Sequence, residues 1–248
     1  MIQFEHLAKH FGDRRVLEDF SLTIPEGETT VIMGYSGTGK SVLLKHIVGL
    51  LEPDGGRVVV DGLVVHELGY DELMQLRGRI GFVFQFAALF DSLSVADNVA
   101  LGLRRQGLEP AAIARRVLEC LRLVELEDTA EHYPAELSGG MRKRVGIARA
   151  IALRPRYILY DEPTTGLDPV TTAAMNDLMI RARRELGATS VVVTHDLSSA
   201  FTVADRIAFL DQGRVRQAGT AQEIRASSDP LVRAFLAGYS DGDHGGGT

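Results

Sequence analysis

A glycine-rich stretch between an apolar run and a helical pattern carries the residues most suited to chemistry. Val31–Leu44 reads Val-Ile-Met-Gly-Tyr-Ser-Gly-Thr-Gly-Lys-Ser-Val-Leu-Leu and fits the pattern Gly-x-x-x-x-Gly-Lys-Ser at Gly34, Gly39, Lys40 and Ser41. An entering strand, a turn whose backbone N–H groups converge and the start of a helix together bind phosphate oxygens. The stretch therefore predicts a phosphate-binding loop.

Each residue type in this loop has a physical task. Glycines at 34, 37 and 39 keep Cβ atoms away from the phosphates. Lys40 brings a compact positive charge to the β and γ oxygens, and the Ser41 hydroxyl is the expected Mg²⁺ ligand. A plain glycine turn is the alternative, but the strand and helix on either side favour phosphate binding. The predicted contacts are Gly34, Tyr35, Ser36, Gly37, Thr38, Gly39, Lys40, Ser41 and Val42.

An apolar strand further along the chain ends in two acids. Tyr157-Ile158-Leu159-Tyr160 leads into Asp161 and Glu162. Adjacent carboxylates at the end of a buried strand are costly unless a cation or a water molecule uses them. Beside a phosphate loop, Asp161 would hold Mg²⁺ through its water shell, and Glu162 would orient or deprotonate the attacking water. Purely structural acids are the alternative.

Two more apolar strands end in polar residues. Gln85 follows Arg79–Phe84, where it either caps the strand or stands at the edge of a site, with an oxygen able to ligate a metal ion. His195 follows Thr189–Thr194 and is expected to contact the γ-phosphate. Parallel strands end at one edge of a sheet, so we expect Gln85, Asp161 and His195 to meet there.

Two other segments suggest contacts with a nucleotide. Ser138-Gly139-Gly140 precedes a helical pattern; the serine is a natural N-cap, and the glycines leave the helix amides open to an anion. A cap alone would explain Ser138 but not the glycines. Phe11 lies in a polar turn and is either a minor core residue or a surface on which an adenine ring stacks; both readings stay open.

The elements around these residues form an α/β pattern. Residues 1–30 read as antiparallel strands, Ile2–Leu7 and Phe20–Ile24. Residues 88–155 have helical periodicity throughout and are expected to form an inserted helical lobe. The arginine pairs of this lobe, Arg104 with Arg105 and Arg115 with Arg116, are most simply its solvated face. Pro230–Gly238 is long enough for a short amphipathic helix, and residues 240–248 are expected to be disordered.

Composition excludes several protein classes. The 248 residues are 45% hydrophobic and 24% charged, as in ordinary globular proteins. A net charge of −6 argues against a nucleic-acid binder. No leader segment and no apolar run of roughly 18 residues is found, so we expect a cytoplasmic protein. The one cysteine, Cys120, suits a reducing compartment and is expected to fill a helix face.

Taken together, these motifs resemble the nucleotide-binding subunit of an ATP-binding cassette (ABC) transporter over nearly the full chain. The matches, in the expected order, are the adenine-stacking Phe11, the Walker A loop Gly34–Ser41, the Q-loop Gln85, the signature Leu137–Met141, Walker B Tyr157–Asp161 with the catalytic carboxylate Glu162, the D-loop Gly166–Asp168 and the switch histidine His195. The usual signature ends in glutamine, whereas this one ends in Met141. Ser138 and Gly140, the phosphate-contacting positions, are unchanged.

The resemblance implies the fold. The expected fold is that of a P-loop NTPase, in the α/β class. It would have a RecA-like parallel sheet core, an N-terminal antiparallel β subdomain and an inserted α-helical signature subdomain. One ABC ATPase domain would span residues 1–248. The core with its β subdomain would take 1–87 and 156–220, the helical subdomain 88–155, a C-terminal extension 221–239 and a disordered tail 240–248.

The resemblance also implies the activity, hydrolysis of ATP with Mg²⁺. Lys40, Glu162 and His195 would be catalytic. Further nucleotide contacts would come from Phe11, Gln85, Ser138, Gly139, Gly140 and Asp168, and metal ligands from Ser41, Gln85 and Asp161. Two copies would pair head to tail, each ATP lying between Lys40 of one copy and Ser138 of the other. An integral membrane permease would turn this cycle into transport.

Within the superfamily, the chain is most similar to the ATPases of Mla-type, MCE-associated phospholipid transporters. The segments that carry this similarity are Ser36–Lys45, Phe84–Phe90, Leu137–Arg144 and Asp161–Pro169. In addition, Asp229–Tyr239 looks like the C-terminal extension of that group, which reaches the paired ATPase. Expected partners are the permease, an MCE-domain protein and a small accessory subunit, at the cytoplasmic face of the inner membrane. The alternatives are an ATPase for amino acids or lipoproteins, or a non-transport ABC protein in cell division or iron–sulfur assembly.

Overall fold

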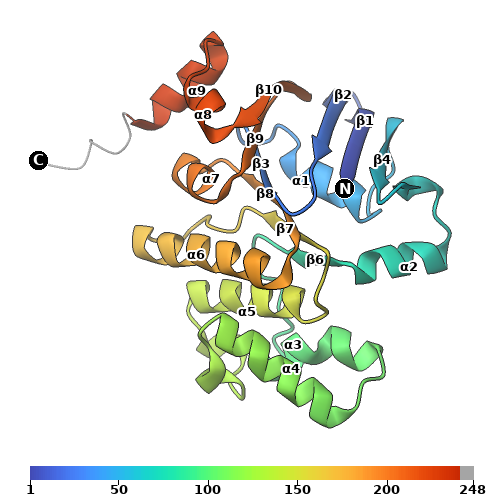
Figure 1. Ribbon diagram of the computed structural model, residues 1–248, viewed down its shortest axis with the longest axis vertical. Coiled ribbons are helices and arrows are strands. Elements are labelled where there is room, and N and C mark those ends of the chain that lie inside the picture. The colour runs from blue at the N-terminus through green and yellow to red at the C-terminus, as the bar shows by residue number, and fades with distance from the viewer. Residues whose placement is uncertain (241–248) are drawn as a thin grey trace, which may run out of the picture. The chain divides into compact units, whose positions relative to one another are not determined.

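The computed structural model describes residues 1–240 (Figure 1). The chain forms two compact units. The first unit combines Met1–His66 with Val193–Thr248, and the second is Glu67–Val192. Strand β8 (Thr189–Thr194) runs across the division. Within residues 1–240, no helix is both long and apolar enough to cross a membrane.

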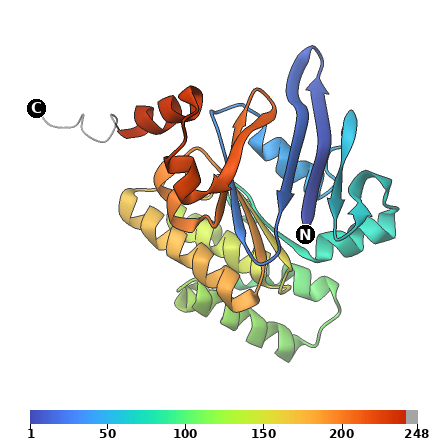
Figure 2. The same cartoon turned by 45° about the horizontal axis from the view of Figure 1, so that its top comes forward.

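An antiparallel sheet opens the first unit. Its strands are β1 (Ile2–Phe11), β2 (Arg14–Ile24), β4 (Gly55–Val60) and β5 (Leu63–Val64), in the order β2-β1-β4-β5. Figure 2 shows β1 and β2 as a long hairpin. Ile2 pairs with Ile24, and the rings of Phe4 and Phe20 meet edge to face with centroids 5.2 Å apart. The predicted strands are confirmed, although both are longer than the apolar segments indicated.

The first unit also contains the strand that leads into the phosphate loop. β3 (Thr29–Met33) is buried along its whole length, as expected for a strand of a parallel sheet covered on both faces. It pairs in parallel with β9 (Arg206–Asp211), which pairs antiparallel with β10 (Arg214–Thr220). Helices α1 (Lys40–Ile47) and α7 (Leu197–Val203) belong to the same unit.

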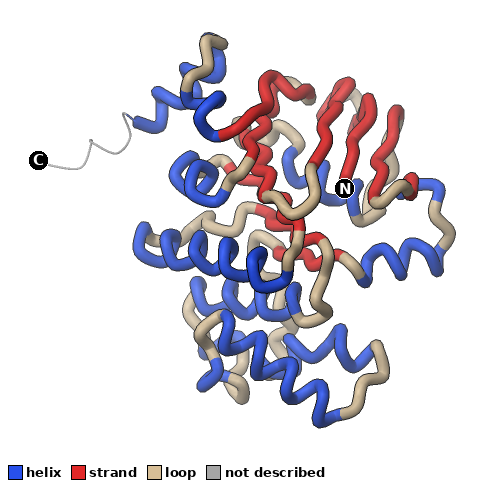
Figure 3. The backbone as a smooth tube through the Cα atoms, in the orientation of Figure 1, coloured by secondary structure: helices blue, strands red, loops and turns tan. Residues whose placement is uncertain are grey.

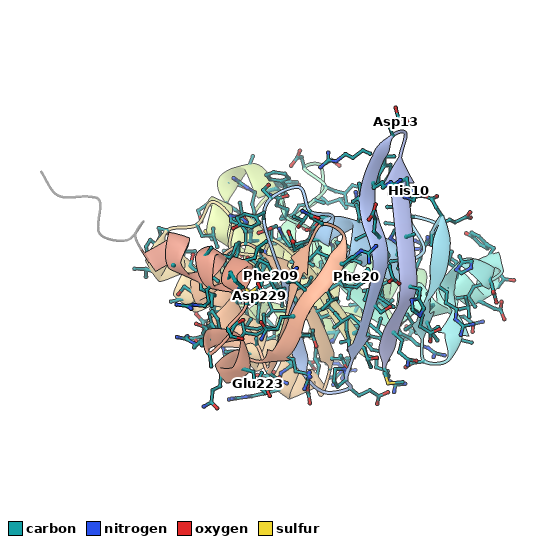
Figure 4. The ribbon with its side chains drawn as sticks, turned by 90° about the horizontal axis from the view of Figure 1, so that it is seen from above. His10, Asp13, Phe20, Phe209, Glu223 and Asp229 are labelled. Carbon is teal, nitrogen blue, oxygen red and sulfur yellow. The ribbon has the colours of Figure 1, made fainter. Side chains whose placement is uncertain are left out.

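The C-terminal segment folds onto its own unit. It comprises α8 (Ala221–Arg225) and α9 (Pro230–Ser240). Asp229, labelled in Figure 4, accepts hydrogen bonds from the backbone N–H groups of Leu231 (2.9 Å) and Val232 (3.2 Å), and its carboxylate pairs with Arg216 at 2.8 Å. The predicted tail 240–248 lies outside the described residues except for Ser240, which ends α9.

The second unit is mostly helical, as the secondary-structure colours of Figure 3 show. It contains the strands β6 (Ile80–Val83) and β7 (Tyr157–Asp161), which pair in parallel. In this pairing Ile80 lies opposite Tyr157. The helices are α2 (Tyr70–Gly78), α3 (Val95–Arg105), α4 (Pro110–Leu123), α5 (Gly139–Ile151) and α6 (Pro169–Leu186), with short 3₁₀ turns at Glu127–Thr129 and Pro134–Glu136. A further 3₁₀ turn, Val65–Glu67, lies at the division between the two units. Residues 88–155 contain only helices and loops, but their assignment as a separate subdomain stays a prediction.

The helical core follows the apolar spacing of the sequence. Val95, Val99 and Leu103 of α3 are buried, and so are Val117 and Leu121 of α4. Cys120 is buried on the same face of α4, as predicted, and this burial raises the pKa of its thiol to about 11. Such a thiol stays protonated at neutral pH, which fits a packing role.

The prediction of solvated arginines is wrong for Arg116. Its guanidinium donates hydrogen bonds to the carbonyls of Ile151 (2.7 Å) and Ala152 (2.9 Å) at the end of α5. The last carbonyls of a helix have no intrahelical partner and attract a cation. Helical spacing cannot show this contact, because the two helices meet only in the folded chain.

We predict that Asn98 is required for the stability of the second unit. Its side chain is fully buried; Oδ1 accepts from the N–H of Phe90 (2.8 Å), and Nδ2 donates to the carbonyls of Phe90 and Leu93 (3.1 Å each) and of Ser94 (3.0 Å). Asn98→Ala leaves these groups without a partner and should lower the free energy of unfolding by about 2–4 kcal/mol in urea titrations.

The control is the exposed Gln106→Ala at the end of the same helix, which should change stability by less than about 0.5 kcal/mol. Equal unfolding midpoints for Asn98→Ala and the native chain would contradict the assigned role.

Candidate functional site

The predicted phosphate loop lies between β3 and α1. Gly39 is the N-cap of α1, and Lys40 begins the helix. The Lys40 ammonium is buried and donates to the carbonyls of Gly34 (2.9 Å) and Tyr35 (3.0 Å), so it braces the loop to which it belongs. Ser41 and Val42 are half-buried on the first turn of the helix, and Ser36 is exposed.

Two loop positions require glycine. A Cβ atom at Gly34 would lie 2.4 Å from the carbonyl oxygen of Leu210, which is closer than real Cβ contacts. Gly39 has φ +98°, and a Cβ there would lie 2.7 Å from Cγ1 of Val16. The loop therefore packs too tightly against β9 and β2 for any side chain at these positions.

Further contacts, from within the motif and from outside it, hold the loop. Arg14 donates to the carbonyl of Gly37 at 2.9 Å, and the Thr38 hydroxyl donates to the carbonyl of Tyr35 at 2.8 Å. The Tyr35 ring meets that of Phe235 on α9 edge to face at 4.9 Å, and Phe235 also meets Phe209 of β9 at 4.9 Å. Sequence reasoning missed the contact with α9, since nothing local links Tyr35 to Phe235.

Phe11 lies at the end of β1 on the β1–β2 hairpin. Its ring is 47% exposed, so the reading of Phe11 as a core residue is wrong. Figure 4 shows the neighbouring residues His10 and Asp13 toward the tip of this hairpin. The Lys9 ammonium lies 5.7 Å from the centroid of the Phe11 ring. Stacking of adenine on Phe11 stays a prediction.

His195 follows the last residue of β8 and is half-buried. The next residue, Asp196, is the N-cap of α7; its carboxylate accepts from the backbone N–H groups of Ser198 (3.0 Å) and Ser199 (3.4 Å). The histidine therefore lies between a buried strand and a capped helix, both of which restrict its backbone.

In the second unit, the predicted signature segment begins α5. Ser138 is the N-cap, and its hydroxyl accepts from the N–H of Met141 at 3.2 Å. Ser138 and Gly139 are exposed. A Cβ atom at Gly140 would lie 2.8 Å from Cγ2 of Thr171, so glycine allows α5 to approach α6 here. An exposed helix start with small residues can accept an anion.

The two acids after the apolar strand lie as predicted, with Asp161 ending β7 and Glu162 following it. Both are buried, each with 9% exposure. Glu162 has φ +48°, a left-handed conformation that costs a residue other than glycine about 1–3 kcal/mol. Its Oε2 accepts a hydrogen bond from the Thr165 hydroxyl at 3.1 Å. The surrounding structure therefore holds this carboxylate in an unfavourable backbone conformation.

Gln85 lies in a turn, which corrects the expectation that it ends its strand. β6 stops at Val83, and Ala87 donates its N–H to the carbonyl of Phe84 at 3.0 Å. Ala87 and Ala88 both have positive φ, +59° and +47°. The strand ends early because this turn needs backbone conformations that a pleated strand does not allow.

A cation from α5 holds the Gln85 turn. The Arg149 guanidinium donates to the carbonyls of Ala87 and Ala88, both at 2.6 Å. The Lys143 ammonium similarly donates to the carbonyls of Pro163 (2.9 Å) and Thr165 (2.7 Å) beside Glu162. Sequence reasoning missed both residues, because a basic side chain on a helix usually indicates a solvated face.

Asp168 is the N-cap of α6. Its carboxylate accepts from the Thr171 hydroxyl (2.5 Å) and from the backbone N–H groups of Val170 and Thr171 (3.0 Å each). These hydrogen bonds, above all those from Thr171, hold the pKa of Asp168 below its usual value. The side chain is thus engaged locally, and its predicted contact with a nucleotide stays a prediction.

The predicted site residues fall into both units. The first contains Phe11, Gly34–Val42 and His195, and the second contains Gln85, Ser138–Gly140, Asp161, Glu162 and Asp168. The expectation that Gln85, Asp161 and His195 meet at one sheet edge stays a prediction, because these residues belong to different units.

The predicted site residues have the chemistry needed to bind a nucleoside triphosphate with Mg²⁺. The start of α1 offers backbone N–H groups, and Lys40 lies against the same loop at Gly34 and Tyr35, a donor set suited to phosphate oxygens. The Ser41 hydroxyl of the first unit is an oxygen donor of the kind Mg²⁺ prefers, and so, in the second unit, is the Asp161 carboxylate.

Comparison with known proteins supports this chemistry. The family model described as ABC transporter matches residues 17–165. The chain is 42% identical over 245 residues to a probable ribonucleotide transport ATP-binding protein, mkl, of Mycobacterium tuberculosis, covering 98% of this chain and 68% of the relative. It is 45% identical over 228 residues to the methionine import ATP-binding protein MetN of Carboxydothermus hydrogenoformans, covering 91% of this chain and 68% of that one.

Solved structures share the fold. The dimeric ATP-binding cassette MJ0796, in a post-hydrolysis state bound to ADP and Pi, is 38% identical with a TM-score of 0.82, covering 89% of this chain and 99% of that one. The cbiO1 protein of Clostridium perfringens, part of the transporter complex cbiONQ, is 31% identical with a TM-score of 0.84, covering 95% and 94%. The predicted fold class is confirmed. The chain therefore belongs to the ABC transporter family as an ATP-binding cassette, an ATPase that uses ATP and Mg²⁺.

Proposed function

We propose that two copies of the chain pair head to tail, so that each ATP lies between Lys40 of one copy and Ser138 of the other. The observation that carries this proposal is the exposed start of α5 at Ser138 and Gly139, an anion-binding helix end separate from the phosphate loop. The similar cassette MJ0796 is described as dimeric, which supports the arrangement.

Each predicted residue takes one task in this arrangement. Lys40 and the first amides of α1 bind the phosphates, and Ser41 and Asp161 hold Mg²⁺, with Gln85 as a further ligand. Glu162 orients the attacking water and accepts its proton, while His195 contacts the γ-phosphate. Phe11 stacks on adenine, and Asp168 contacts the nucleotide from the D-loop. These roles rest on the motifs, on the burial of Lys40, Asp161 and Glu162, and on the exposed ring of Phe11.

Mg²⁺ supplies charge neutralisation at the phosphate oxygens when bound. The chain's own residues supply positioning: the loop around Lys40 is braced through its carbonyls, and the Glu162 carboxylate is held by Thr165. Binding of ATP then closes the pair, and hydrolysis loosens it. A permease that contacts both copies would receive this opening and closing as a mechanical stroke.

We further propose that the transported substrate is a phospholipid, moved between the inner and outer membranes. Support comes from the similarity of Ser36–Lys45, Phe84–Phe90, Leu137–Arg144 and Asp161–Pro169 to the Mla-type group, and from the helix α9 beyond the core. In this proposal the partners are a permease, an MCE-domain protein and a small accessory subunit, at the cytoplasmic face of the inner membrane.

A second candidate is an importer of amino acids or nucleotides. The names of the relatives favour it, since they are described as ribonucleotide transport and methionine import proteins. An ATPase subunit does not bind the transported molecule, so its residues alone do not choose between these substrates.

An exposed aromatic cluster after β6 is a suitable contact for the permease. Phe86 is 86% exposed, and Phe84 (40%) and Phe90 (55%) belong to the same loop. Large apolar side chains gathered on a surface usually mark an interface. The loop also carries Gln85, so a protein bound there would be linked to the predicted site.

We predict that Glu162→Gln keeps ATP affinity but lowers the rate of hydrolysis by at least about a hundredfold, because the attacking water loses its carboxylate base. Phosphate release and equilibrium ATP binding measure the two effects, and size-exclusion chromatography with ATP should reveal accumulated dimers. The exposed Glu185→Gln on α6 is the control and should hydrolyse ATP normally. Undiminished turnover in Glu162→Gln removes that residue from its role.

We predict that Phe86→Ser lowers the amount of permease captured with the tagged chain from detergent-solubilised native membranes by roughly tenfold or more, since an aromatic side chain that becomes buried at an interface can contribute more than about 1.4 kcal/mol, which corresponds to tenfold. Basal ATPase activity of the purified chain should not change. Tyr70→Ser on α2, also strongly exposed at 74%, is the matched control and should capture normal amounts. Unchanged capture by Phe86→Ser excludes this loop as the contact.

We predict that the permease complex captured by the native chain contains an MCE-domain protein and bound phospholipid, detected by mass spectrometry. A complex with a binding protein for amino acids or nucleotides would instead support the second candidate and exclude the lipid proposal.

A further inference from the structure

The Lys143 side chain connects α5 to the loop that carries Glu162. Lys143 lies on α5, just over one turn beyond the N-cap Ser138. Its ammonium donates to the carbonyls of Thr165 (2.7 Å) and Pro163 (2.9 Å), with the carbonyl of Glu162 at 3.5 Å. An ammonium has three N–H donors, and here they face three carbonyls of one turn.

This cation is half-buried, with its ammonium turned toward the backbone of the loop. Burial lowers the pKa of Lys143, and the charge of Glu162 acts in the opposite direction. Removing an ammonium from water is costly unless its hydrogen bonds are replaced, and the loop carbonyls replace them. The contact is therefore part of the folded structure and not a chance orientation of a surface lysine.

The same turn controls the Glu162 carboxylate. The Thr165 hydroxyl donates to Oε2 of Glu162 at 3.1 Å, and Lys143 holds the Thr165 carbonyl. Glu162 has φ +48°, a conformation that persists only where its surroundings enforce it. Lys143 holds the turn at its beginning and at its end, and thereby fixes both the backbone and the side-chain partner of Glu162.

We propose that Lys143 is a positioning residue for ATP hydrolysis, which holds the Glu162 carboxylate in the orientation needed to activate water. The proposal rests on the proposed role of Glu162. One rigid helix then carries both Ser138, the predicted contact for the partner copy's ATP, and Lys143, the support of the carboxylate. Docking at the start of α5 and the geometry of hydrolysis are thereby linked through a single element.

The test is Lys143→Met, which keeps the length of the side chain but removes its donors. We expect kcat for ATP hydrolysis to fall by about tenfold to a hundredfold, because a misplaced reacting group costs that much. KM and the equilibrium affinity for ATP should change by less than about threefold, since the phosphate loop is untouched. Lys143→Arg, which retains charge and donors, should recover part of the rate.

Lys45→Met is the matched control, because Lys45 is an exposed lysine on α1. It should leave kcat and KM at the native values. Thr165→Val serves as a second variant, because it leaves every charged residue in place and keeps the size of the side chain. It removes the hydroxyl that contacts Glu162, and it should lower kcat without changing ATP affinity even if Lys143→Met folds poorly.

A double variant separates positioning from general destabilisation. If Lys143 acts through Glu162, then Lys143→Met combined with Glu162→Gln should hydrolyse ATP no more slowly than Glu162→Gln alone. Native kcat in a folded Lys143→Met variant, native kcat in Thr165→Val, or losses that multiply in the double variant would overturn the proposal. Native turnover in Glu162→Gln would instead overturn the proposed function itself, so the two failures are distinguishable.

Discussion

Hydrogen bonds from cationic side chains to backbone carbonyls hold the loops on which the site depends. A loop that binds phosphate must leave its N–H groups open, so it has to be held by its carbonyls. Lys40 and Arg14 do this for the phosphate loop, through Gly34, Tyr35 and Gly37. Lys143 and Arg149 do the same for the turns at Glu162 and Gln85.

Strained backbone occurs in the same two turns of the second unit. Glu162, Ala87 and Ala88 all have positive φ without being glycine, which costs free energy in each case. Side chains of α5 hold both turns, and Arg116 binds the carbonyls at the C-terminal end of this helix. This helix thus connects the exposed Ser138, the carboxylate turn and the Gln85 turn within one unit. Arg149 thus joins the turn that carries Gln85 to the helix that begins after Ser138.

Membership in the ABC transporter family shows that the chain is an ATPase. It does not show which molecule is transported. The relatives at 42–45% identity are described as ribonucleotide and methionine transport proteins, whereas our lipid proposal rests on the motif similarity to Mla-type ATPases. The ATPase residues serve ATP in all of these cases, so they carry little substrate information. Phe86, next to Gln85, is strongly exposed, and helix α9 follows the core strands, so both are places to test for partner-specific contacts.

The sequence by itself determined the phosphate loop, the two acids at the end of β7, the N-cap Ser138 and the buried faces of α3 and α4, because each depends on spacing within one element. Only the tertiary structure decided that Phe11 is exposed, that Gln85 lies in a turn, and that Arg116, Lys143 and Arg149 bind carbonyls instead of facing solvent. The reason is separation along the chain: Arg149 meets the carbonyl of Ala88 across 61 residues. Local periodicity identifies the apolar face of a helix, but it does not specify which distant backbone a cation on another face will meet.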